Sequence, residues 1–407
     1  MHDEAPTPIT EDMAGLYPEE AKIVDSALVF ARTRLTTESA RWEHARIHPR
    51  DAIVEAARLG LNRIEVALDR GGLGMRFLVK LRVAQALARE DMAFSFALVN
   101  AHNAVLRIAR DGTPAHRERW LPGLLRGDSI GAICLTEPDA GSDFSGIRTR
   151  ATRRPGGWTL VGEKAWATNA VAADHALVYA QTDPGLGYRG IAAFLVPVEL
   201  PGVRRSEPES LVGAHAIGAG GFGFDGVELD EGALFYPPGE AFKRALASIN
   251  GARTYVAGMC CAMLERSLEL AYAYARERLA FGDPLWANQG LRWRLADVLT
   301  ELEAARALTD RAATLIDNAR SVGGADMQGR IVLAAAHAKK HAARAAESGL
   351  RECAQVLGAR GLRDDLPIGR HLVCARVAHF VDGTTEMQNE RIAALMPAAL
   401  GIGAPAP

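Results

Sequence analysis

The sequence predicts an α+β protein in which a helical region, a β region and a second helical region follow one another. Two observations support this fold class: apolar residues recur at helical spacing near both ends of the chain, and short apolar runs alternate with turn residues in the middle. At 407 residues the chain is long enough for two or three packed units, since a single core rarely grows past roughly 250–300 residues. We expect domains at residues 1–130, 131–236 and 237–407.

Two groups of segments show helical spacing, one on each side of the β region. The first group lacks dense β-branching and comprises residues 21–33, 50–59, 77–89 and 95–110. The second group is typical of an antiparallel bundle and comprises residues 241–278, 291–321, 327–357 and 385–395. Between the groups, apolar runs separated by Gly, Pro, Asp and Asn predict strands at residues 158–161, 175–179 and 191–196.

Composition and charge argue against several classes of partner. The formal net charge of −2 provides no basic field for nucleic acid or anionic lipid, so we expect neither. The N-terminal sequence is acidic and lacks the basic-then-apolar order of a secretory signal, and no run of about 18 apolar residues predicts a membrane span. The five cysteines are odd in number and show no C-x-x-C spacing, so we expect reduced thiols in a cytoplasmic protein and no metal site.

The sequence GAGGFG at residues 218–223 fits G-x-G-x-x-G, a nucleotide-binding fingerprint. That motif works when a strand precedes it and the N-terminus of a helix receives the pyrophosphate. Here the residues that follow, FDGVEL, alternate like a strand. We therefore interpret the segment as a glycine-rich β turn.

The most informative segments are AICLTEPDAGSD at residues 132–143 and GEKAWATNA at residues 162–170. In the first, a strand-like run ends at Thr136, and a proline and a glycine then force an irregular loop that presents hydroxyls and carboxylates. That loop is either a plain polar turn or part of a binding site. In the second, Trp166 is either a core residue or an apolar wall for a flat ring, to which Thr168 would donate a hydrogen bond.

Together, these two segments resemble the flavin-site motifs of the acyl-CoA dehydrogenase family. Further motifs in the same order and spacing extend the resemblance over most of the chain: RGGLG at 70–74, GTPAHRERWLPGLLRGD at 112–128, ARERLAFG at 275–282 with NQ at 288–289, QVLGARG at 355–361 and DGTTEMQ at 382–388. The resemblance implies an α-helical N-terminal domain, a middle β-barrel domain and a C-terminal four-helix bundle. It also implies non-covalent FAD between barrel and bundle, and a homo-oligomer, usually a tetramer, with a dimer as the alternative.

The resemblance also implies roles for residues that match the family's motifs. Thr136, Trp166 and Thr168 would face the isoalloxazine, and Ser142 would lie near the substrate's pantetheine portion or the cofactor phosphates. Thr384 and Glu386 would touch the same flavin. The FAD of a neighbouring subunit would be reached by Arg278, Phe281, Gln289, Gln355 and Gly358. An arginine makes physical sense there, because a guanidinium grips a pyrophosphate with two hydrogen bonds.

The chemistry that the resemblance implies is α,β-dehydrogenation of an acyl thioester. A carboxylate takes the α-proton while hydride leaves Cβ, and hydrogen bonds to the thioester carbonyl stabilise the enolate-like transition state.

Asp382 stands where most members carry the glutamate base, and Gly383 leaves room for the thioester. A minority of members place the base before an arginine on a bundle helix; here Ala252 precedes Arg253. Asp382 and Arg253 are thus the predicted catalytic residues, and Ser142, Arg253 and Gly383 the predicted substrate contacts. We expect burial to raise the pKa of Asp382 and nearby Arg253 to oppose that rise.

Departures from the family's pattern leave the acyl group open. Asp382 is one methylene shorter than glutamate, and Val381 replaces an aromatic residue of the acyl pocket. Asn100, His102 and Asn103 either bring polarity near the acyl chain or belong to a surface face. We predict an FAD-dependent dehydrogenase of a short, branched, cyclic or functionalised acyl group on CoA or acyl carrier protein, with an electron-transfer flavoprotein as acceptor. The alternatives are a flavin monooxygenase or desulfinase of the same fold, and a non-catalytic flavin-retaining subunit.

Overall fold

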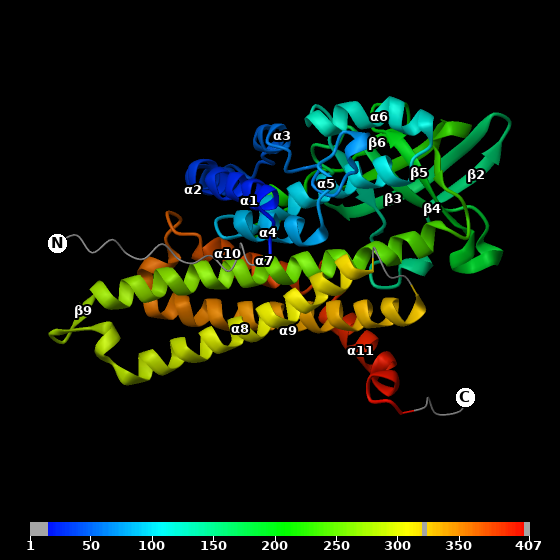
Figure 1. The fold of residues 1–407 in the computed structure, drawn as a ribbon. Coiled ribbons are helices and arrows are strands. Elements are labelled where there is room, and N and C mark those ends of the chain that lie inside the picture. The colour runs from blue at the N-terminus through cyan, green and yellow to red at the C-terminus, as the bar shows by residue number, and fades with distance from the viewer. Residues whose placement is uncertain (1–14, 320–323, 403–407) are drawn as a thin grey trace.

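Helices occupy both ends of the chain, and a sheet lies between them (Figure 1). The computed structural model describes residues 15–319 and 324–402. The helices are α1 (Pro18–Phe30), α2 (Thr36–Ala45), α3 (Arg50–Arg58), α4 (Phe77–Ala88), α5 (Met92–Asp111), α6 (Pro114–Arg126), α7 (Ala241–Glu277), α8 (Gln289–Asn318), α9 (Ala325–Leu357), α10 (Ile368–Ala378) and α11 (Thr385–Ala399). The strands are β1 (Gly131–Cys134), β2 (Arg150–Arg154), β3 (Gly157–Ala167), β4 (His175–Gln181), β5 (Ile191–Pro197), β6 (Val203–Arg205), β7 (Gly220–Asp230), β8 (Leu234–Tyr236), β9 (Leu279–Ala280) and β10 (Asp283–Pro284). The predicted order of helical, β and helical regions is confirmed.

The N-terminal helices are organised around α4 and α5, which are buried on almost every side. Both helices carry apolar residues around most of their circumference, and a helix of this kind must lie inside the core. α4 packs against α1, α5 and the long helix α7, so the N-terminal helices are fixed on the bundle. Figure 1 shows them in blue and cyan along one side of α7.

The middle region forms one eight-stranded sheet in the order β6–β7–β3–β2–β4–β5–β8, with β1 paired in parallel to β4. β3 and β7 are antiparallel, and their register shifts between Lys164 and Ala167, close to the end of β3. Alternate side chains of the sheet pack into a core that includes Trp158, Phe194 and Phe222. In the glycine-rich segment at 218–223, residues 220–223 already belong to β7, so a strand follows rather than a helix, as the sequence predicted. Most of the segment is therefore strand and not the expected turn.

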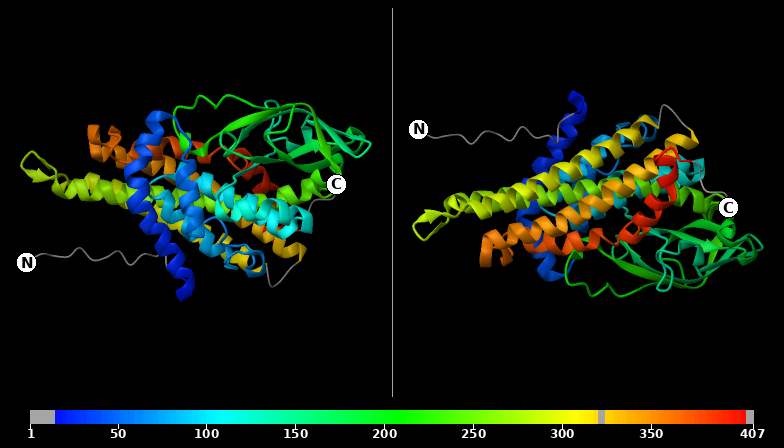
Figure 2. Two further views of the ribbon diagram at one scale, coloured as in Figure 1. Left: turned by 90° about the horizontal axis from the view of Figure 1, so that it is seen from above. Right: turned by 90° about the horizontal axis from the view of Figure 1, so that it is seen from below.

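Three long helices, α7, α8 and α9, pack against one another, and α10 and α11 both pack against α9. Figure 2 shows the long helices side by side, with the hairpin of β9 and β10 at the end away from the sheet. The second predicted bundle helix ends at Asn318, and its expected last two residues, 320 and 321, lie outside the described part of the chain. The sequence reasoning missed α2, α6 and α10. In α6, Pro122 and Gly123 lie inside the helix, and these residue types usually mark a break. No helix in residues 15–319 and 324–402 is long and apolar enough to cross a membrane.

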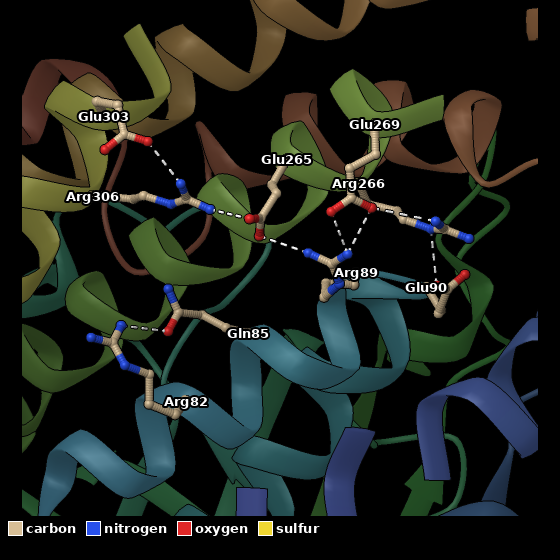
Figure 3. A network of polar contacts seen from close by, with 9 residues as sticks. All are labelled: Arg82, Gln85, Arg89, Glu90, Glu265, Arg266, Glu269, Glu303 and Arg306. Atoms are coloured by element: carbon tan, nitrogen blue, oxygen red, sulfur yellow. Dashed lines mark hydrogen bonds and ion pairs between the residues drawn. The ribbon is translucent and has the colours of Figure 1, made fainter. Parts of the chain in front are cut away.

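A network of charged side chains joins the end of α4 to the bundle (Figure 3). Arg89 donates to Glu265 and to Glu269 of α7, at 2.7 Å in each case. Glu265 also pairs with Arg306 of α8. These side chains are partly exposed, so each pair contributes modestly to stability. Their combined geometry fixes α4 along α7, whose first half forms part of the cavity described next.

Candidate active site

One large cavity lies where the helical and β regions meet. Its volume is about 1500 Å³, and its walls come from α5, the ends of β1 and β3, the first half of α7 and the loop between α10 and α11. The predicted site residues that line it are Thr136, Ser142, Trp166, Thr168, Arg253, Asp382, Gly383 and Thr384. The fold therefore brings together the widely separated motifs that the sequence singled out.

A buried ion pair fixes the strand ends that form one wall of the cavity. Lys164 Nζ donates to Glu137 Oε1 at 2.7 Å, and both side chains are buried. Glu137 also accepts two backbone N–H groups, at 2.6 and 2.9 Å, so its carboxylate is turned away from the cavity. The Ala165 N–H donates to the Thr136 carbonyl oxygen at 3.0 Å. These bonds hold Thr136 and Trp166 on adjoining strand ends.

Trp166 offers a flat apolar surface to the cavity. Its φ is 57°, in the left-handed region that residues other than glycine rarely adopt, and the residue is 54% exposed. A large aromatic ring held exposed on a cavity wall suits a planar ligand. Thr136 and Thr168 add half-buried hydroxyl groups to the same cavity. This wall has the aromatic plane and the hydrogen-bonding groups that a flavin ring requires.

Asp382 lies on the same cavity in an unfavourable backbone conformation, with a φ of 53°. Arg253 Nε donates to the Asp382 carbonyl oxygen at 3.2 Å. Lys339 Nζ donates to the carbonyl oxygens of the two flanking residues, Val381 and Gly383. Gly383 has a φ of 93°, which favours glycine, and an added Cβ would lie 3.4 Å from the Arg253 guanidinium. Two cations thus hold this loop through its carbonyl groups and leave the carboxylate unpaired.

Burial raises the pKa of Asp382 from its ordinary value to about 6, while Lys339 and Arg253 oppose the rise. This agrees with the direction and the Arg253 effect that the sequence predicted. Asp382 Oδ2 is buried and has no hydrogen-bond partner among the described residues. Burial also lowers the pKa of Lys339 to about 8 and that of Arg253 to about 10. A carboxyl group with a raised pKa and an unpaired oxygen on a cavity is suited to accept a proton near neutral pH.

The start of α11 follows directly after this loop. Thr384 lines the cavity and is the N-cap of α11, with its hydroxyl accepting the Met387 N–H at 3.4 Å. Glu386 lies in the first turn of α11, is exposed and does not line the cavity. Its flavin contact therefore stays a prediction.

The remaining predicted cofactor residues lie at the far end of the bundle. Arg278 and Phe281 belong to the β9–β10 hairpin, which Figures 1 and 2 show at the end away from the sheet. Gln289 begins α8, Gln355 lies in the last turn of α9, and Gly358 follows α9 directly, all at the same end of the bundle. Phe281 is fully exposed. A single chain does not bring these residues to the cavity, and their contact with the FAD of a neighbouring subunit stays a prediction.

α5 gives the cavity a polar side. Asn100 and Asn103 both line the cavity. This agrees with the interpretation that these residues bring polarity near the acyl chain. His102 does not line the cavity, because it is buried on another face of α5, where the Glu65 N–H donates to its Nε2 at 3.2 Å. The hypothesis that His102 lies along the acyl chain is therefore wrong.

Comparison with known proteins identifies the family of this chain. Models of the N-terminal, middle and C-terminal domains of acyl-CoA dehydrogenases match residues 17–128, 132–227 and 239–396. The chain belongs to the acyl-CoA dehydrogenase family. The human short-chain specific acyl-CoA dehydrogenase of mitochondria is 32% identical over 370 residues, which cover 89% of this chain and 86% of the relative.

Solved structures of acyl-CoA dehydrogenases share the whole fold. Butyryl-CoA dehydrogenase from Megasphaera elsdenii has a TM-score of 0.87 and 29% identity, with 94% of this chain and 98% of that chain covered. A glutaryl-CoA dehydrogenase from Mycobacterium smegmatis in complex with FADH2 has a TM-score of 0.85 and 29% identity, with 96% of each chain covered. This acyl-CoA dehydrogenase homologue is accordingly an FAD-dependent oxidoreductase. The exposed Trp166 ring and the unpaired Asp382 oxygen fit FAD and a thioester in the cavity.

Sequence reasoning missed several residues that shape this acyl-CoA dehydrogenase site. Lys164, Lys339 and Lys80 are buried and bound to carboxylate, amide or carbonyl oxygens. A lysine in a strand or helix is normally solvated, and its spacing alone gives no sign of burial. Lys339 in particular lies within an alanine-rich helical run that identifies a packed helix but not the loop that the lysine reaches. Only the fold reveals these contacts.

Proposed function

We propose that this protein removes one hydrogen each from Cα and Cβ of an acyl thioester, with Asp382 as the base. The observation that carries the proposal is the Asp382 Oδ2 atom, which is buried on the cavity wall and has no hydrogen-bond partner in residues 15–319 and 324–402. No other carboxylate occupies either of the positions that the family uses for its base, since Ala252 precedes Arg253. Asp382 takes the Cα proton, and the electron pair of the Cβ–H bond leaves as hydride. Bound FAD supplies the two-electron oxidant.

The loop around Asp382 supports this role. Because Arg253 and Lys339 bind carbonyl oxygens, the carboxylate is not neutralised in an ion pair. Their charges still lower its pKa, and the value of about 6 leaves the group mainly ionised at pH 7. The carboxylate is then a base that is both available and strong enough to act near neutral pH.

The assembly and partners that we propose follow the family resemblance. We propose a homo-oligomer, a tetramer or a dimer, in which the hairpin with Arg278 and Phe281 reaches the FAD of a neighbouring subunit. Both residues are exposed at the end of the bundle, which leaves them accessible to another chain. We further propose CoA or acyl carrier protein as the thioester handle, an electron-transfer flavoprotein as acceptor, a cytoplasmic location and domain boundaries near residues 130 and 236.

Anaerobic mixing of the FAD-loaded protein with a panel of acyl-CoA thioesters tests the proposed reaction. We expect loss of the flavin absorbance near 450 nm with at least one thioester, together with formation of the α,β-unsaturated product. A protein that no thioester bleaches, but that consumes oxygen rapidly once an external reductant is added, would be a monooxygenase instead. The panel should include butyryl-, isobutyryl-, hexanoyl- and cyclohexanecarbonyl-CoA.

A further inference from the structure

We propose that the acyl group carries a neutral hydrogen-bonding substituent, such as a hydroxyl or keto oxygen, which binds a buried polar wall of the cavity. This inference rests on the proposed acyl-thioester function and names the class of acyl group. The wall consists of Glu65, Lys80, Asn103 and Tyr255, which we call the distal polar wall. All four residues line the cavity that also contains Asp382.

The distal polar wall is a chain of hydrogen bonds built from four separate segments. Lys80 Nζ of α4 donates to Glu65 Oε2 at 2.9 Å and to Asn103 Oδ1 of α5 at 2.7 Å. Asn103 Nδ2 donates to the Tyr255 hydroxyl of α7 at 3.2 Å. Lys80, Glu65 and Tyr255 are almost completely buried. Because the wall is buried, the Asn103 amide and the Tyr255 hydroxyl need hydrogen bonds from neighbouring side chains or from the cavity contents.

Tyr255 connects this wall to the reacting end of the cavity. It lies two residues after Arg253 on α7, and the negative charge of Asp382 helps to raise the pKa of its hydroxyl, with burial as the larger cause. The hydroxyl oxygen accepts from Asn103, and the described residues provide no acceptor for the hydroxyl hydrogen. Because Tyr255 lines the cavity, this hydrogen is a donor that an oxygen on the acyl group would accept.

The charges of the wall favour a neutral substituent over a charged one. Lys80 and Glu65 already form an ion pair, so a carboxylate on the acyl group would meet the Glu65 anion as well as the Lys80 cation. An ammonium group would likewise meet the Lys80 cation as well as the Glu65 anion. In both cases the buried charge is poorly compensated, which is unfavourable. A hydroxyl or keto oxygen adds no net charge and accepts hydrogen bonds from the Tyr255 hydroxyl and the Asn103 amide.

An unsubstituted alkyl group fits this wall poorly. The alkyl group would displace water from Tyr255 and Asn103 without replacing the hydrogen bonds that the water makes. Buried polar groups left without hydrogen bonds lower the affinity. A site built to hydrogen-bond a substrate hydroxyl discriminates strongly against the analogue that lacks it. We therefore expect at least about tenfold tighter binding of the hydroxyl compound.

Binding measurements with matched pairs of thioesters test the inference without relying on turnover. Titration calorimetry of the FAD-loaded protein compares 4-hydroxybutyryl-, 5-hydroxypentanoyl- and 6-hydroxyhexanoyl-CoA with pentanoyl-, hexanoyl- and heptanoyl-CoA, which have the same number of chain atoms. Adipoyl-CoA provides the charged comparison. We expect one hydroxyacyl compound to bind at least about tenfold more tightly than its alkyl partner, with adipoyl-CoA no better than the alkyl series.

Tyr255→Phe removes the proposed donor while keeping the ring. We expect this variant to lose most of the hydroxyacyl preference, whereas Tyr274→Phe, the same change on α7 outside the cavity lining, keeps it. Flavin content and thermal unfolding show whether each variant is folded.

Equal or weaker binding of every hydroxyacyl compound, or tightest binding of adipoyl-CoA, would overturn the inference. Bleaching of FAD by alkyl thioesters in that case would leave the proposed function standing, and absence of all bleaching would count against the proposed function.

Discussion

Asp382 shows how a carboxylate can remain a base in a site that contains two cations. Arg253 and Lys339 bind the carbonyl groups of residues 381–383, so their charges act on Asp382 without occupying its Oδ2 oxygen. The sequence could identify Asp382, because DGTTEMQ stands in the family's catalytic segment, and it could give the direction of the pKa shift. It could not identify Lys339, whose contact with the loop spans 42 and 44 residues of sequence.

The pH dependence of flavin reduction should report the pKa of Asp382. Its folded pKa of about 6 lies above the ordinary value of 3.8, so the ionised base is lost as the pH falls through 6 rather than through 4. We expect the bleaching rate constant to rise about tenfold per pH unit below pH 6 and to level off above it. Anaerobic stopped-flow measurements between pH 5 and pH 8 provide the profile. A rate that is constant over this range would show that another group limits the reaction.

Replacement of Lys339 by methionine should alter both the pH profile and the plateau rate. Lys339 lowers the pKa of Asp382, so its removal should move the acid limb of the profile to higher pH. The loop also loses the bonds to Val381 and Gly383, and the resulting misplacement should reduce the plateau rate roughly tenfold or more. Lys340→Met, one position along α9, is the matched control and should change neither quantity. An unshifted acid limb in Lys339→Met would contradict the electrostatic role.

At the scale of elements, the buried pair of Lys164 and Glu137 helps to hold the ends of β1 and β3 together. The sequence predicted the strand end at Thr136 and left Trp166 open between core and cavity wall. The structure favours the wall, because the backbone at Trp166 turns its ring outward. Glu137 is one of the carboxylates of the loop that the sequence predicted, and Lys164 and two backbone N–H groups bind it. Long, regular helices were predictable from their period, whereas α10 and the loop contacts depend on tertiary packing.

Lys164→Met should destabilise the protein and weaken flavin retention together. The variant leaves Glu137 as a buried charge without its cation, which costs about 3–5 kcal/mol of unfolding free energy. The loosened strand ends should also release FAD more readily during gel filtration. Arg153→Met removes the exposed pair with Glu231 from the same sheet and should cost about 1 kcal/mol or less. Chemical denaturation of both variants provides the comparison, and equal losses would show that Lys164 has no special role.

At the scale of the whole molecule, the chain separates two sets of predicted cofactor residues along the bundle. One set lines the cavity beside the sheet, and the other lies near the β9–β10 hairpin and the end of α9. The family motifs gave the order of the domains, but only the three-dimensional arrangement shows that one chain cannot bring both sets to one place. The oligomer that we propose would join them.

Arg278→Ala should therefore reduce FAD content without altering the cavity of its own chain. Arg278 is exposed and is not among the described residues that line the cavity, so a loss of FAD would have to arise in a neighbouring subunit. We expect a clearly lower ratio of FAD to protein after dialysis, with the folded state preserved by circular dichroism. Arg292→Ala, an exposed arginine at the start of α8, is the control. A monomer that retains FAD in sedimentation experiments would contradict the shared site.

The central claim is that Asp382 removes the Cα proton in an FAD-containing cavity, and Asp382→Asn tests it most directly. The substitution keeps the size of the side chain and removes its capacity to act as a base. Anaerobic stopped-flow reduction by the best thioester of the panel should slow by about a hundredfold or more, while the variant keeps its full complement of FAD. Bleaching at the wild-type rate would contradict the assignment of Asp382 as the base.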